Sequence, residues 1–244
     1  MIYQSKTGSA AHATQAHSAP QHLAGIVHVH MRHVLARSLS CAYLLLLAVC
    51  ASATTILGMD IDQLTADAEF IFEGEVILSE SRQDSSSGII STYITFNIID
   101  VMKGDYDAAA IELKFMGGVF NGQDVQVSGL KIPELGEEGI YFVESTSRDV
   151  INPLLGWSQG HFIIVDDDGV RRMSTADSEP VTEVQSVTGI PAAIKKPKLL
   201  IQDSGDTAAG VSTEASPLMI RRALSVDEFK ARIQDLIEIR SASN

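Results

Sequence analysis

Beyond residue 53 the sequence has no cysteine and a single histidine, His161, so the chemistry open to this part of the chain is narrow. The lack of thiols excludes a cysteine nucleophile and any disulfide bond. One histidine is too few for a zinc site that needs two or more His or Cys ligands. Apolar runs of transmembrane length are also missing from this part. We therefore expect no cofactor and no metal.

Acidic residues are missing from residues 1–53, which instead hold six of the seven His, both Cys and three of the 18 Lys and Arg. A basic run over residues 31–37 precedes the apolar stretch 42–49 and the small residues Ala51-Ser52-Ala53. This order is typical of a signal peptide that is cleaved after Ala53. We predict a non-native or disordered extension over 1–30, a signal peptide over 31–53, and export to the periplasm or the cell exterior without a membrane span after cleavage.

Two other interpretations of the leader stay open. The stretch Leu47-Ala48-Val49-Cys50 resembles a lipoprotein box, in which Cys50 would be acylated, although Val49 is bulkier than the usual residue. We favour simple cleavage. In the second interpretation the histidines before residue 31 form a metal-binding arm. Their irregular spacing disfavours such an arm. These histidines are His12, His17, His22, His28 and His30.

Cleavage after Ala53 would leave 191 residues with 15 basic and 31 acidic side chains, a net charge near −16. Nucleic acid and anionic lipid repel such a chain, so neither is an expected partner. The remaining length suffices for one domain with its own apolar core. We expect that core to hold the fold without disulfides.

Residues 54–185 have the pattern of a mainly β domain. Helical spacing over 59–68 predicts a short N-terminal helix, and Gly74 within the first strand indicates a bulge. The turn Asp168-Gly169 is typical of a tight hairpin. Strands are predicted at 70–80, 91–101, 111–115, 124–128, 139–144, 161–165 and 170–173. Short strands without intervening helices predict an OB-like five-stranded barrel or a small sandwich, with an added hairpin.

The last part of the chain divides into a tether and a helix. Residues 186–216 lose periodicity and are rich in small and polar residues, so we predict a flexible tether. Residues 217–244 contain the capping box Ser225 to Glu228 and an amphipathic helix. We expect its apolar stripe to dock on the β domain: Val226, Phe229, Ile233, Leu236 and Ile237.

The stretch Gly156-Trp157-Ser158-Gln159-Gly160-His161 holds the only tryptophan and the one histidine after the leader. We favour a structural corner, because glycines beside a strand allow close backbone approaches. The alternative is a ligand-facing loop whose rim is Trp157, Gln159 and His161. Ser158 lies in no G-x-S-x-G elbow, so no catalytic residue is assigned.

The sequence also resembles known proteins. The runs A-E-F-I-F-E-G-E-V, T-Y-I-T-F-N-I-I-D-V-M-K-G, G-E-E-G-I-Y-F-V and G-W-S-Q-G-H-F-I-I-V resemble a group of uncharacterised exported bacterial β-domain proteins, over most of residues 54–240. That resemblance implies no reaction and no catalytic residues. The first two runs are also distantly similar to the OB-type barrels of netrin-like and metalloprotease-inhibitor modules. Those modules use an N-terminal cysteine, where this chain would begin with Thr54-Thr55.

From these observations we expect an exported, non-enzymatic binding or accessory protein that contacts another exported protein or an envelope polymer. The alternative is a secreted hydrolase that uses acidic residues, with Ca²⁺ assistance. The run Asp166-Asp167-Asp168-Gly169 suits that alternative poorly, because Ile164 stands where an EF-hand loop needs an aspartate.

Overall fold

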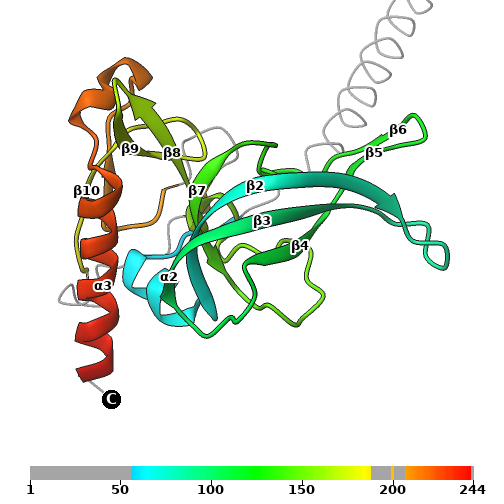
Figure 1. Cartoon of the computed structure of the whole chain (residues 1–244), viewed down its shortest axis with the longest axis horizontal. Coiled ribbons are helices and arrows are strands. Elements are labelled where there is room, and N and C mark those ends of the chain that lie inside the picture. The colour runs from blue at the N-terminus through cyan, green and yellow to red at the C-terminus, as the bar shows by residue number, and fades with distance from the viewer. Residues whose placement is uncertain (1–55, 188–198, 201–206, 243–244) are drawn as a thin grey trace, which may run out of the picture. The chain divides into compact units, whose positions relative to one another are not determined.

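A six-stranded antiparallel sheet forms the centre of the fold in the computed structural model, which describes residues 56–187, 199–200 and 207–242 (Figure 1). The strand order is β4-β3-β2-β7-β8-β9. The strands are β2 (Phe70–Gln83), β3 (Ile90–Lys103), β4 (Ala110–Met116), β7 (Glu138–Val143), β8 (His161–Asp167) and β9 (Val170–Thr175). The mainly β, antiparallel class is confirmed, and the described residues form no closed barrel.

Three small antiparallel pairs lie outside this sheet. They are β1 (Ile56–Leu57) with β11 (Leu199–Leu200), β5 (Gly118–Phe120) with β6 (Gln123–Val125), and β10 (Val181–Val184) with β12 (Val211–Thr213). The strand predicted at 124–128 is thus shorter and belongs to a separate hairpin. Strand β12 falls within the interval predicted as a tether, so the end of that interval is ordered by pairing with β10.

The helices are α2 (Ile61–Asp67), η2 (Trp157–Gly160), η3 (Pro217–Arg222) and α3 (Val226–Ala242). The predicted N-terminal helix is confirmed, and Asp60 and Gln63 form its capping box. The extension 1–30, the signal peptide 31–53, Cys50 and most of the tether (188–198 and 201–206) lie outside the described residues.

The sheet has an apolar core on each face. The helix-side core packs Ile71, Phe142 and Phe162 of the sheet against α2 and α3. The loop-side core lies on the opposite face and includes Phe72, Phe96, Phe115 and Tyr141. Docking of the predicted C-terminal stripe is confirmed. Its residue Ile237 is partly buried and packs against the helix-side core, and its other four residues are buried in that core: Val226, Phe229, Ile233 and Leu236.

The pairing of β2 with β3 shifts register at three bulges, of which the two that follow Glu73 determine which residues face outward. The pairing with β3 shifts between Glu73 and Gly74, as the mid-strand glycine predicted, and a Cβ on Gly74 would lie 2.9 Å from the carbonyl oxygen of Asn97. The other of these two shifts falls between Val76 and Leu78. Because it inserts one residue, Leu78 turns to the face opposite Val76 and is 48% exposed. Regular alternation along β2 would place Leu78 on the apolar face of Val76, and the inserted residue removes it from that face.

A buried carboxylate links the sheet to α3. The side chain of Glu73 is 2% exposed, and its two oxygens accept from Arg171 of β9 at 2.6 Å and from Lys230 of α3 at 2.8 Å. Arg171 also pairs with Glu138 of β7 at 2.8 Å, and Lys230 also pairs with Asp100 of β3. This charge network ties four strands to the helix. Burying a charge is costly unless it is paired, so the network fixes where α3 docks.

The stability of the fold should fall in acid, because hydrogen bonds lower the pKa of several carboxyl groups, among them those of Glu69 and Glu228. Thr146 and Ser145 donate to Glu69, and the backbone and hydroxyl of Ser225 donate to Glu228. A folded-state pKa below the unfolded value of 4.5 gives stability that is present above that pH and is lost as the pH falls through the folded pKa.

We expect urea unfolding midpoints that are level from pH 7 to 5 and that decline below pH 4.5. The double variant Glu69→Gln, Glu228→Gln should be less stable at pH 7 and should show a shallower acid decline. An acid limb unchanged in that variant would contradict this assignment.

Candidate functional site

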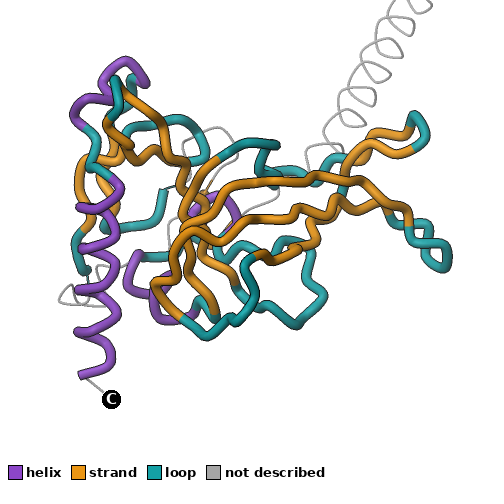
Figure 2. Tube along the Cα trace, viewed as in Figure 1, coloured by secondary structure: helices purple, strands orange, loops and turns teal. Residues whose placement is uncertain are grey.

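The distal half of β2–β3–β4 presents a sheet face that α2 and α3 do not cover. Strands β2 and β3 run on beyond the helices, toward the right of the view in Figures 1 and 2. Beyond the bulge after Val76, the pairing registers place three rows of three residues side by side on this face. We call these residues the outer face: Leu78-Thr95-Glu112, Glu80-Tyr93-Lys114 and Arg82-Ser91-Met116.

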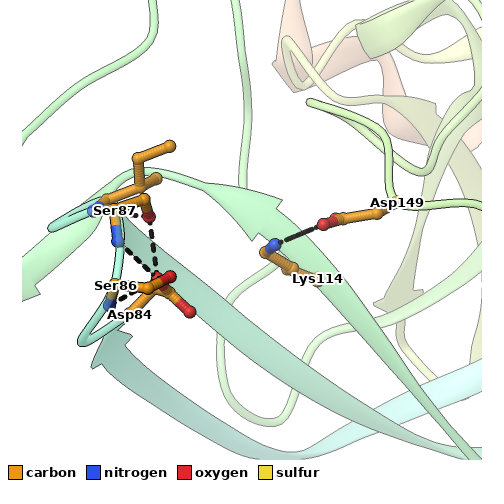
Figure 3. Close-up of polar contacts among 6 residues, drawn as sticks. Asp84, Ser86, Ser87, Lys114 and Asp149 are labelled. Carbon is orange, nitrogen blue, oxygen red and sulfur yellow. Dashed lines mark hydrogen bonds and ion pairs between the residues drawn. The ribbon is translucent and has the colours of Figure 1, made fainter.

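A cavity of about 270 Å³ opens at the end of the outer face. Its floor is formed by residues of β3 and β4, and its walls are the β2–β3 turn on one side and residues 149–151 on the other. Figure 3 shows Asp84 of the turn and the Lys114–Asp149 pair facing one another across the strands. The backbone N–H of Met116 donates to the carbonyl oxygen of Ile151 at 3.0 Å, which fixes the second wall to β4.

The β2–β3 turn is held in shape by Asp84. Its Oδ1 accepts from the backbone and the hydroxyl of Ser86, at 3.0 and 2.6 Å, and from those of Ser87, at 2.7 and 2.9 Å (Figure 3). These hydrogen bonds lower the pKa of Asp84 well below its usual value, and the bond from the Ser86 hydroxyl has the largest effect. The turn is therefore preformed and negatively charged at neutral pH.

Two cations lie on the outer face, and each is paired. The guanidinium carbon of Arg82 lies 4.3 Å from the centre of the Tyr93 ring, while its Nη2 donates to Glu80 at 2.7 Å and to Glu112 at 3.3 Å. Lys114 Nζ donates to both carboxylate oxygens of Asp149 at 2.9 Å. The bonds to Glu80 and to Asp149 raise the pKa of Arg82 and of Lys114, so both side chains are charged. The face thus offers alternating charges around a stacked arginine and tyrosine.

The three residues of the alternative rim are not gathered at the surface. Trp157 is half-buried at the start of η2, with a φ of 64°. Gln159 is 1% exposed, accepts from the backbone N–H of Met59 at 2.7 Å and donates to the carbonyl oxygen of Gly156 at 3.0 Å. His161 is 2% exposed. The structure therefore corrects the rim: Gln159 and His161 lie in the interior, and their contacts are those of a structural corner.

His161 forms a buried pair with a glutamate that the sequence did not single out. Its Nε2 lies 2.6 Å from Oε1 of Glu137, which also accepts from the hydroxyl of Tyr141 at 3.2 Å. The pKa of Tyr141 is raised, mainly because the hydroxyl is buried and, to a smaller extent, because the Glu137 charge lies nearby. These residues line neither the cavity described above nor a second, more open cavity of about 430 Å³ at β6 and residues 126–132. A ligand therefore has no route to His161 through either cavity.

The aspartates at 166–168 lie at the tip of the β8–β9 hairpin, where Asp166 and Asp167 end β8 and Asp168 begins the turn. Asp168 and Gly169 have φ values of 53° and 84°, as the predicted tight turn requires, and Arg221 pairs with Asp168 at 2.6 Å. Within 56–187, 199–200 and 207–242, no three His, Cys, Asp or Glu residues are grouped as metal ligands. None of the helices in the same ranges is long and apolar enough to cross a membrane.

Sequence reasoning missed Arg82, Tyr93 and Lys114. The sequence did contain a signal for them in β3. Tyr93 and Thr95 alternate with the apolar, buried Ile94 and Phe96, and this alternation predicts that one face of the strand is polar. The matching residues of β2 were hidden by the bulge after Val76, which changes the face of every later residue in the strand.

Comparison of the chain with protein-family models, with curated proteins and with solved structures gives no match.

Proposed function

We propose that this protein is a non-enzymatic binding module of the periplasm or the cell exterior whose outer face binds a partner polypeptide. The observation that carries the proposal is the Arg82–Tyr93 stack at the centre of a sheet face that none of the described helices covers. Arginine and tyrosine are among the residues that contribute most to protein–protein binding, and a neighbouring concave wall can shelter them from water. The preformed Asp84 turn supports such a role, because less ordering is needed on binding.

The surroundings favour a polypeptide over a sugar or an anionic polymer. Sugar sites use an open aromatic plane, whereas Arg82 lies over the ring of Tyr93. An anionic polymer needs unpaired cations, whereas carboxylates hold both Arg82 and Lys114. Half-exposed apolar side chains border the charges, as at the rim of a protein interface: Leu78, Ile89 and Ile151.

The location supports a relationship to OB-type barrels, which we propose as the finer class of the fold. OB folds bind their ligands on the face of their second and third strands and on the loop between the first two. In the order of the sheet strands those elements are β3, β4 and the turn at Asp84, which together line the cavity. The sheet here is open, and residues 151–155 bridge from Met116 of β4 to β7.

Photo-cross-linking tests the proposed face directly. A photoreactive phenylalanine analogue in place of Tyr93, in the exported protein, should form adducts with a discrete polypeptide in the producing cells. Leu218 is 90% exposed in η3 and is the matched control position, which should not give the same adduct. Equal labelling of that polypeptide from both positions would reject the outer face as its binding site.

Affinity measurements with the partner identified by cross-linking show how much each residue of the outer face contributes to binding. We expect Tyr93→Ala and Arg82→Ala each to weaken binding about 30-fold or more, which corresponds to about 2 kcal/mol for a central contact. The control Arg222→Ala removes an exposed arginine that pairs with Glu214, and it should leave the affinity unchanged. Calorimetric titration with all three variants checks the prediction, and equal losses in all of them would contradict it.

A further inference from the structure

Strand β4 ends the sheet with an open edge. Ala109 accepts from Ile98 of β3, and Met116 donates away from β3 to Ile151. Backbone groups of successive residues in an antiparallel strand point to alternate sides, so Glu112 and Lys114 direct their N–H and C=O groups to the same side as Met116. None of the hydrogen bonds among the described residues uses those backbone groups. An open row of this kind is able to accept another strand.

The sequence of β4 is complementary to itself in one register. When two copies pair antiparallel about Leu113, Glu112 of each lies opposite Lys114 of the other, on the outer face. Leu113 then lies opposite Leu113. Because Glu112 and Lys114 both point their backbone groups outward, each of these two pairs is a hydrogen-bonded pair, giving four N–H···O bonds. Opposite charges in facing positions stabilise a strand pair, and like charges destabilise it.

The existing partners of these side chains do not block the arrangement. The Lys114 and Asp149 side chains are 36% and 73% exposed, and the Arg82–Glu112 contact is 3.3 Å long. Exposed ion pairs of this kind contribute little, so they can be shared or exchanged. The bond from Met116 to Ile151 limits the new ladder to the centre of the strand.

We propose that β4 is the interface of a two-fold symmetric homodimer, in which the two sheets join edge to edge. A two-fold axis normal to the sheet places both outer faces on the same side, with the two Arg82–Tyr93 stacks flanking the junction. If the outer face binds a polypeptide as proposed above, the dimer presents two such sites side by side. The interface itself does not depend on that function.

A charge-swap series in the mature, exported chain tests the dimer. We expect reversible dimerisation in sedimentation equilibrium, and both Glu112→Lys and Lys114→Glu should weaken it about tenfold or more, because each turns two attractive pairs into repulsive ones. The double variant Glu112→Lys, Lys114→Glu restores opposite charges and should restore the dimer. Arg222→Glu is the control for an exposed charge change far from β4 in the sequence and should have no effect.

The outcomes separate this proposal from the proposed function. A wild-type chain that is monomeric at every concentration at which it stays soluble would overturn the dimer, as would a dimer indifferent to the swaps. Thermal unfolding of each variant shows whether it is folded. Tyr93→Ala should keep the dimer and lose the partner, whereas Lys114→Glu should lose the dimer first, so the two interfaces fail independently.

Discussion

Replacing Arg171 and Lys230 together with methionine should destabilise the fold by about 3 kcal/mol, since both cations that hold the Glu73 carboxylate are then gone. The side chain of Glu73 is 2% exposed and sits between β2 and α3, so it would be left buried without a counter-charge. This loss is at the lower end of the destabilisation that follows when a buried ion pair is broken, because the side chain of Arg171 is itself 41% exposed. For a single domain this is a large share of the total stability.

A third substitution identifies the cause. Adding Glu73→Met to the double variant removes the stranded charge and should recover most of the lost stability, because apolar side chains of similar volume can replace a buried ion pair. Arg232→Met, at an exposed position on the same helix, is the matched control and should change little. Urea unfolding at pH 7 measures all of these. A triple variant no more stable than the double would show that packing, and not the unpaired carboxylate, is responsible.

Phe229→Ala should have an effect of similar or larger size, about 3–5 kcal/mol. Phe229 is fully buried, and its ring centre lies 4.9 Å from that of Phe162 in β8. Truncation leaves a cavity between α3 and the sheet and removes the aromatic contact. Because α3 depends on this packing for its stability, the helix should also become labile.

Hydrogen exchange distinguishes loss of the helix from general weakening. In the Phe229→Ala variant the amides of α3 should exchange faster than those of β2 and β3, and urea unfolding should give the loss in stability. Ile239→Ala changes a 53% exposed side chain on the same helix and should cost less than about 1 kcal/mol. Equal costs for the two variants would show that α3 is not held by the helix-side core.

Local signals were sufficient to predict much of the architecture from the sequence. The Ser225–Glu228 cap, the Asp168-Gly169 turn and the apolar stripe of α3 each act within a few residues, and all appear in the structure as expected. The order of strands was not predictable in this way. It depends on which edges meet across the whole chain, and the pairing of β7 with β2 joins residues about 70 positions apart.

The candidate site was harder to predict than the fold. Glu73 is a charged side chain in β2, yet it is buried where α3 supplies Lys230 from 157 residues away. The residues of the outer face were obscured by the bulge after Val76 in β2, which has no glycine to mark it. The alternative that placed His161 at a rim fails because the turn before β7 brings Glu137 over the ring nitrogen of a buried His161. At Glu73 and His161 a long-range contact overrode the local pattern, and on the outer face a bulge did so.

The helix-side core bears on how such a chain could cross a membrane. It draws on residues from Ile61 to Leu236, so no fragment lacking the final helix can complete it. The helix-side face of the sheet therefore stays incomplete until α3 has been synthesised. If the protein is exported as proposed above, a core that needs α3 leaves the chain incompletely folded during synthesis, which is the state in which a translocation channel can accept it.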